Sequence, residues 1–310
     1  MKTTRFLVAG LFAASLAVST AAVHSEELRI GTASQGGAFY PIGQGISNLV
    51  TKYAGGGMTM VPVVTAGGVQ NPLLIESGEV NIGITNTNLA LLANEGKGPY
   101  KDKKINLAAV AALHPSVLSM VTLAGSPIKT FADIKGKRVA VGPAGGGTLV
   151  FVNRLLEVHG MTIKDITPSF LSYNDGFSQL ADGNVDAAFA LAGYPTAAVT
   201  QARATKDIRF IRIPDDKFDA MLKKYPYYTR VAIPKATYRL DEDAIVLGVN
   251  NVLVVRSDMS ADKVYAITKA VFDHLDEFKA ENANARQIDP KASLSLPIKL
   301  HPGAARYFKP

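Results

Sequence analysis

A glycine-rich turn placed between an apolar stretch and an amphipathic stretch occurs twice in this chain. The first copy occupies residues 28–41 and the second residues 137–149. A second pair of similar segments follows the two copies: residues 75–82 resemble residues 180–187 at a constant offset of 105. A turn of this kind places backbone N–H groups at a helix N-terminus, where anions bind. The repeat therefore predicts two similar α/β lobes that face one small anion from both sides.

Strand-like and helix-like segments alternate along the rest of the chain. We expect strands at residues 58–64, 80–85, 107–113, 117–123, 170–173, 186–191, 208–213 and 252–255. Such alternation is typical of a mainly parallel sheet with helices on both faces. No low-complexity linker interrupts the chain, so we expect crossing strands near residues 114–119 and 250–256 to join the lobes and form the hinge. The predicted division is lobe 1 at residues 26–116 plus 250–310, and lobe 2 at residues 117–249.

Residues 1–25 read as a cleavable signal peptide. Lys2 and Arg5 precede an apolar run at residues 6–18, and small residues follow up to Ser25. The chain has no cysteine, which leaves neither a disulfide nor a lipid-anchoring residue. We therefore expect an exported protein that diffuses in the periplasm of a Gram-negative cell, as a monomer.

Composition and motifs argue against catalysis and against nucleic-acid binding. The net charge of +7 is spread over polar segments and lacks a basic–aromatic motif. No lysine precedes Thr148 in the second glycine turn, which therefore differs from a nucleotide-binding loop. The five histidines show no metal-ligand spacing, and no Gly-x-Ser-x-Gly occurs. We expect no catalytic residue, no metal and no cofactor.

The ligand site is predicted at the loops that follow the strands, because ligands bind beyond the carboxyl ends of parallel strands. These loops contain no lysine, arginine or histidine, so main-chain N–H groups and helix termini would hold an anion. The candidate ligand-binding residues are Ser34, Gly36, Gly37, Ala38, Phe39, Tyr40, Thr85, Asn86, Thr87, Gly145, Gly146, Gly147, Thr148, Tyr173 and Gly193.

Several of these residues have a structural alternative. Either glycine turn alone could simply allow a tight bend, and only the duplication favours ligand contact. Residues 85–88 could equally cap a helix. Tyr194-Pro195 is better explained as a structural turn, with contact from Gly193 the lesser alternative.

Taken in order, these motifs resemble the TAXI-type solute receptors of TRAP transporters. The matching segments are residues 31–43, 134–139, 142–148, 227–234 and 300–304. The resemblance implies a two-lobed periplasmic binding protein of type II topology, with two Rossmann-like domains joined by hinge strands. Two positions depart from the family, which usually has a Gln-Ser-Asp-like run at residues 85–87 and a serine at Gly146.

The function expected from the sequence is capture of a small carboxylate-bearing solute and its delivery to a TRAP permease in the membrane. The resemblance implies a glutamate-like amino acid, an oxo acid or a dicarboxylate as the solute. One alternative is a receptor for an ABC importer or a sensor kinase. A less favoured alternative is a periplasmic enzyme built on the same scaffold.

Overall fold

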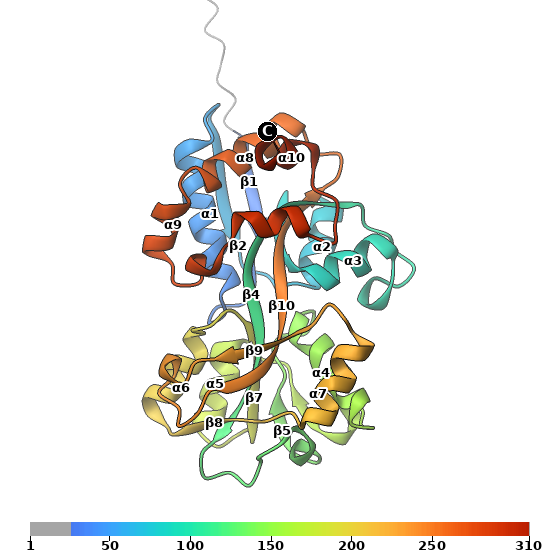
Figure 1. Ribbon diagram of the computed structural model, residues 1–310, viewed down its shortest axis with the longest axis vertical. Helices are drawn as coiled ribbons and strands as arrows, with labels where there is room; N and C mark the ends of the chain where they lie inside the picture. The colour runs from blue at the N-terminus through green and yellow to red at the C-terminus, as the bar shows by residue number, and fades with distance from the viewer. Residues whose placement is uncertain (1–25, 310) are drawn as a thin grey trace, which may run out of the picture.

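A computed structural model describes residues 26–309, so the signal peptide predicted at residues 1–25 lies outside the described residues. Two α/β lobes are stacked along the long axis of the molecule, and the long strands β4 (Leu107–Leu123) and β10 (Ala244–Arg256) run between them (Figure 1). The predicted fold class is confirmed. Within residues 26–309, no helix is both long enough and apolar enough to cross a bilayer.

The strands of lobe 1 form a mainly parallel arrangement that one antiparallel strand completes. Strand β1 (Glu26–Gly31) pairs in parallel with β2 (Met58–Val63) and with β3 (Ile82–Asn86). Strand β10 lies antiparallel between β3 and β4. The resulting order β2-β1-β3-β10-β4 points the carboxyl ends of β1, β2 and β3 toward lobe 2.

Lobe 2 continues the same sheet. Strand β7 (Ala187–Ala192) pairs with β4 and, in parallel, with β5 (Arg138–Ala140). The parallel edge strand is β6 (Thr167–Ser169), while β8 (Ile208–Phe210) and β9 (Thr229–Ile233) pair with the lower parts of β4 and β10. In the described residues the ten strands thus form one sheet.

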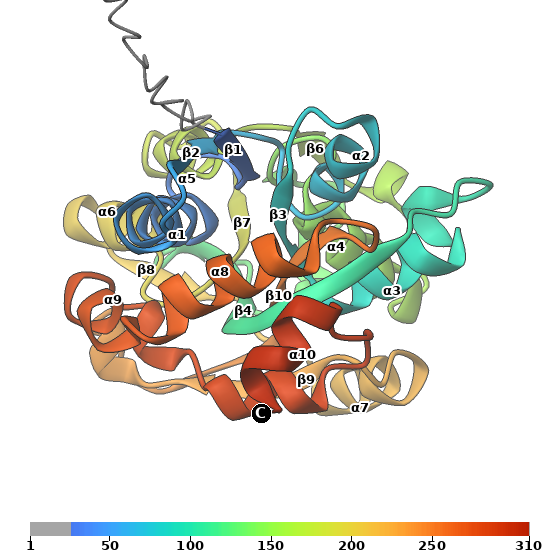
Figure 2. The same cartoon turned by 90° about the horizontal axis from the view of Figure 1, so that it is seen from above.

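Helices cover both faces of the sheet in each lobe, because apolar residues recur along one side of each helix. The helices of lobe 1 are α1 (Phe39–Tyr53), α2 (Gln70–Ser77), α3 (Thr87–Glu95), α8 (Ala261–Phe272), α9 (Leu275–Glu281) and α10 (Pro302–Phe308). One core lies under α1, α8 and α9, and a second lies under α2 and α3 on the opposite face. Figure 2 shows α1 and α8 side by side across lobe 1.

Lobe 2 has the same layered arrangement. Its helices are α4 (Gly147–Val158), α5 (Tyr173–Ala181), α6 (Ala197–Thr205) and α7 (Asp215–Lys224). Helices α4 and α7 cover one core, and α5 and α6 cover the other. Short 3₁₀ helices occur in both lobes: η1 (Gly98–Tyr100), η2 (Phe131–Ile134), η3 (Ile163–Asp165), η4 (Lys235–Thr237), η5 (Ala285–Gln287) and η6 (Pro290–Ser295).

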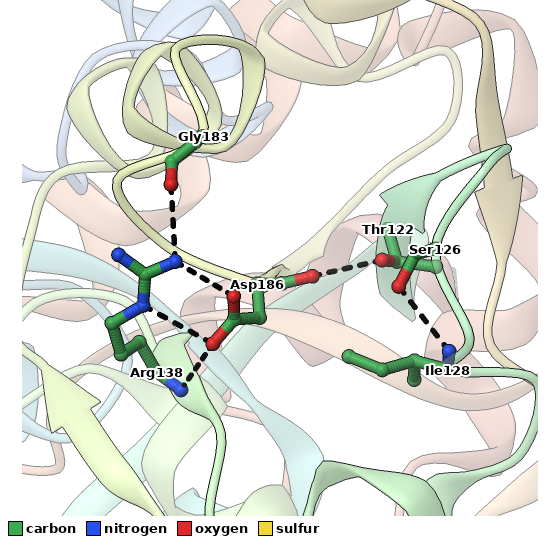
Figure 3. A network of polar contacts seen from close by, with 6 residues as sticks. All are labelled: Thr122, Ser126, Ile128, Arg138, Gly183 and Asp186. Atoms are coloured by element: carbon green, nitrogen blue, oxygen red, sulfur yellow. Dashed lines mark hydrogen bonds and ion pairs between the residues drawn. The ribbon is translucent and has the colours of Figure 1, made fainter.

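The internal repeat is visible in matching contacts of the two lobes. In lobe 1 the Arg29 N–H donates to Asn81 Oδ1 at 2.8 Å, and in lobe 2 the Arg138 N–H donates to Asp186 Oδ2 at the same distance. Figure 3 shows that Asp186 also binds the Arg138 guanidinium, whose Nη2 reaches the Gly183 carbonyl at 3.0 Å. Asn81 and Asp186, which are 105 positions apart, therefore each link the first strand of their lobe to the turn before its third parallel strand.

Asp186→Asn should weaken lobe 2 modestly, and more at neutral than at acidic pH. The Arg138 hydrogen bonds hold the pKa of Asp186 below its usual range, so the ionised carboxylate stabilises the fold at neutral pH. That contribution declines as pH falls below about 4 toward the folded-state pKa. We expect the urea midpoint to drop by a few tenths molar at pH 7, because the pair is partly exposed, and to drop by less at pH 3.

The matched control for this variant is Asn81→Asp, which places the carboxylate in the lobe 1 copy of the same turn. Within residues 26–309 the bond to the Asn81 side-chain oxygen comes from the Arg29 main chain and not from a guanidinium. We therefore expect no gain in stability at pH 7. An equal loss for Asp186→Asn at both pH values would contradict the ionic explanation.

Several local expectations were wrong. Residues 170–173 are not a strand, since β6 ends at Ser169 and Tyr173 begins α5. The two strands expected at residues 107–113 and 117–123 form one continuous strand through His114-Pro115.

Candidate functional site

A small cavity lies between the two lobes, where the carboxyl ends of the parallel strands meet. Its volume is about 10 Å³, roughly the room that one water molecule needs. The lining residues come from both lobes: Ala33, Gly37, Ala38, Phe39, Ala66, Gly67, Gly68, Asn86, Gly147, Tyr173 and Leu191. The two glycine-rich turns that the repeat singled out thus face the same space.

Three helices begin at this cavity without a side-chain cap. Helix α1 has Ala38 at its N-cap, α3 has Asn86 and α4 has Gly146, and none of these side chains accepts a bond from its own helix. The first N–H groups of a helix have no partner within the helix and carry a partial positive charge. The cavity therefore lies at three electropositive helix termini.

The predicted site residues fall into two groups. Those that line the cavity are Gly37, Ala38, Phe39, Asn86, Gly147 and Tyr173. The others lie behind or beside it: Ser34, Gly36, Tyr40, Thr85, Thr87, Gly145, Gly146, Thr148 and Gly193. The Thr85 hydroxyl donates to the Gly68 carbonyl at 2.6 Å, which fixes a lining glycine. Tyr40 is outside the lining, and its neighbour Phe39 is inside.

Lining residues missing from the candidate set are Ala33, Ala66, Gly67, Gly68 and Leu191. Ala66, Gly67 and Gly68 lie in the loop after β2, and Leu191 lies near the end of β7, so they too fall at the carboxyl ends of strands. Outside the two glycine turns, the sequence contained no chemical reason to choose residues without polar side-chain atoms.

Tyr173 is fixed in place by its hydroxyl. That oxygen lies 2.8 Å from the Thr148 hydroxyl and donates to the Leu191 carbonyl at 3.0 Å. Burial raises the pKa of Tyr173, so its hydroxyl stays protonated. Tyr173 and Thr148 therefore form part of the rigid wall of lobe 2.

A buried polar network connects the cavity to the hinge strands. Asn86 Nδ2 donates to Asn251 Oδ1 at 2.7 Å, and Asn251 Nδ2 donates to the His114 carbonyl at 2.7 Å and to Ser116 Oγ at 2.9 Å. The β4–β10 pairing shifts register between Asn250 and Val252. Burial lowers the pKa of His114 to about 3, so this ring is neutral.

The two lobes are in direct contact. The Ala198 N–H donates to the Gly36 carbonyl at 3.3 Å. Gln287 Nε2 donates to the Tyr194 carbonyl at 2.8 Å. Each bond links a residue of one lobe to a residue of the other, so the structure has the lobes closed around a cavity with room for about one water molecule.

The cavity lining carries no charged side chain. Among the lining residues Tyr173 is the one with an ionisable group, and burial keeps it neutral. Such a site can bind an anion through main-chain N–H groups, without the two positioned titratable groups that general acid–base chemistry needs.

Two lobes, two crossing strands and a cavity between strand ends define the fold of the periplasmic binding proteins. The chain belongs to the NMT1-like family, which matches residues 30–310. This family match does not single out the TAXI-type receptors.

The similar proteins are of two kinds, namely curated proteins matched by sequence and solved structures matched by fold. An Escherichia coli (strain K12) protein described as aliphatic sulfonates-binding is 35% identical over 95 residues, which are 30% of either chain. A solved Listeria monocytogenes structure, described as an L-cystine ABC transporter, is 13% identical, covers 86% of this chain and 99% of its own, and has a TM-score of 0.54. The Xanthomonas axonopodis pv. citri alkanesulfonate-binding protein bound to MOPS is 16% identical, covers 87% and 82%, and has a TM-score of 0.50. At these identities the structures support the fold alone.

Proposed function

We propose that this protein binds one small organic oxyanion between its lobes and delivers it to a membrane importer. The observation that carries the proposal is the meeting of the α1, α3 and α4 N-termini at one uncharged cavity. Four or five charge-assisted hydrogen bonds at about 1.5–3 kcal/mol each would offset the cost of association. A total near −8 kcal/mol corresponds to a micromolar Kd.

The head group of the ligand is a carboxylate or a sulfonate. The sequence favoured a carboxylate-bearing solute, whereas the E. coli and Xanthomonas relatives are described as sulfonate-binding. Both are oxyanions without a requirement for a metal, and helix N-termini accept either. The proposed contacts are the predicted site residues that line the cavity, with Gly67, Gly68 and Leu191 added from the geometry.

The importer is better proposed as an ABC type than as the TRAP permease that the TAXI resemblance implies. The Listeria structure is described as that of an L-cystine ABC transporter. We propose a periplasmic location and a cleavable leader at residues 1–25, on the sequence pattern alone. The closed form would be the one that the membrane partner recognises, because a ligand shifts a conformational equilibrium only through its differential affinity.

The test is calorimetric titration of the protein after denaturation, removal of co-purified small molecules and refolding. A panel of C2 to C6 alkanesulfonates, monocarboxylates and dicarboxylates should contain at least one micromolar ligand. Neutral sugars and divalent cations serve as controls. Binding of a sugar or a cation with no oxyanion binding would overturn the proposal. Chemical change of the bound compound during long incubation would favour the enzyme alternative.

A further inference from the structure

Asn86 uses its side chain in an unusual way for a residue at the start of a helix. Asparagine is among the strongest N-cap residues because its oxygen accepts from the first turn. Asn86 is the N-cap of α3, yet its side chain makes no such bond. Its amide nitrogen instead donates to Asn251 on β10, 165 positions away in the sequence. Asn86 therefore contacts the hinge strand β10 instead of capping α3.

The hydrogen-bond network determines which way the Asn86 amide faces. The His114 main-chain carbonyl can only accept, so the Asn251 atom 2.7 Å from it is the amide nitrogen. Asn251 must then present its oxygen to Asn86, and only the Asn86 nitrogen can donate to it. Asn86 Oδ1 is left on the opposite side, toward the cavity.

The position of that oxygen matches this assignment. A Cβ built on Gly147 would lie 2.8 Å from Asn86 Oδ1, and one built on Gly68 would lie 3.1 Å from it. Both glycines line the cavity, one from each lobe. Asn86 is only 1% exposed, and its side-chain hydrogen bond within residues 26–309 uses Nδ2, which leaves Oδ1 without a donor from the protein. This acceptor keeps some access to the cavity, because it is not among the fully enclosed unpartnered atoms.

We infer that Asn251 is a positioning residue for ligand specificity, and that the bound oxyanion carries a neutral hydrogen-bond donor, a hydroxyl, beside its charged group. This inference rests on the proposed function. Asn86 Oδ1 faces the cavity without a donor from the protein, so a ligand with a hydroxyl gains a hydrogen bond there that the plain ligand cannot make. No carboxylate lines the cavity to balance an ammonium group, which is why the donor is neutral.

The ligand test compares matched pairs that differ by one hydroxyl: glycolate with acetate, lactate with propionate, and isethionate with ethanesulfonate. In the wild type we expect the hydroxylated member of at least one pair to bind about tenfold more tightly. Asn251→Ala frees the Asn86 amide to rotate, so the preference should fall to less than twofold while the affinity for the plain member stays similar. Asn86→Ala should also remove the preference.

Asn250→Ala is the matched control, since Asn250 is the exposed neighbour on the same strand. Asn250→Ala should keep the tenfold preference for the hydroxylated member. If Asn251 had a purely structural role, Asn251→Ala would lower the affinities for both members of a pair equally. If oxyanions bind but every pair is bound equally by the wild type, this inference is wrong and the proposed function stands.

A measurement without ligand tests the orientation directly. In the nitrogen-15 NMR spectrum, the side-chain NH₂ of Asn86 should exchange slowly with solvent in the wild type and in Asn250→Ala, and quickly in Asn251→Ala. Fast exchange in the wild type would overturn the inference even if no ligand of the panel binds. A neutron structure with the Asn86 nitrogen on the cavity side would do the same.

Discussion

Gly147→Leu is expected to weaken binding of the oxyanion by at least a hundredfold and to leave the fold intact. Gly147 is the first residue of α4, and a Cβ there would lie 2.8 Å from Asn86 Oδ1 and 3.0 Å from Leu191 Cδ2. The added side chain would fill the cavity and displace the ligand from the α4 N-terminus. Gly147 is not among the glycines with positive φ, so the backbone accepts an L-residue without strain.

Calorimetry with the best ligand of the panel measures this effect, and urea unfolding checks the fold. Gly125→Leu is the matched control, because Gly125 lies in an exposed turn with nothing within 4 Å of its added Cβ and no positive φ. We expect that control to bind as the wild type does. Wild-type affinity in Gly147→Leu would remove the second glycine turn from the site.

Gly193→Val is expected to hold the lobes apart and to weaken binding by about ten- to thirtyfold. A Cβ on Gly193 would lie 2.1 Å from Asn284 Oδ1 and 2.7 Å from His114 Cδ2. Gly193 follows β7 in lobe 2, whereas Asn284 belongs to the C-terminal part of lobe 1. The clash with Asn284 exists only when the lobes meet, so the open form is favoured and the ligand loses its contacts with one lobe.

Small-angle X-ray scattering with saturating ligand provides the readout, with a larger radius of gyration expected for Gly193→Val than for the wild type. Adding Asn284→Ala removes the nearest atom and should restore part of both compactness and affinity. An unchanged radius together with weaker binding would mean that Gly193 acts through the ligand rather than through closure.

The order of the elements and the meeting of the two glycine turns were predictable because they rest on local patterns. Glycine turns after apolar strands mark the β1–α1 and β5–α4 connections, and they do meet at one cavity. The start of α5 carries a sequence signal as well, because Ser172 and Asp175 have the spacing of a helix N-cap pair and Ser172 accepts from the Asp175 N–H at 3.1 Å. Residues 170–173 were instead assigned to a strand because apolar residues there were given more weight than this N-cap spacing.

The polar network at the hinge could not be predicted in the same way. Asn251 contacts His114 and Asn86 across separations of 137 and 165 residues. The contacts depend on the pairing of β10 with β3, where Asn251 lies opposite Asn86, and with β4 at a register shift. Asn284 faces Gly193 through the closure of the two lobes. Pairings of this kind depend on packing that a single sequence does not reveal, whereas helix and strand periodicity is local.

The place of β10 in the sheet has a consequence for biosynthesis. Strand β10 lies between β3 and β4, so the centre of lobe 1 is completed by residues 251–256, after the chain has passed through lobe 2. Lobe 1 therefore cannot be completed until more than four-fifths of the chain has been synthesised. We expect its folding to come late in translation, after the residues of lobe 2 have left the ribosome.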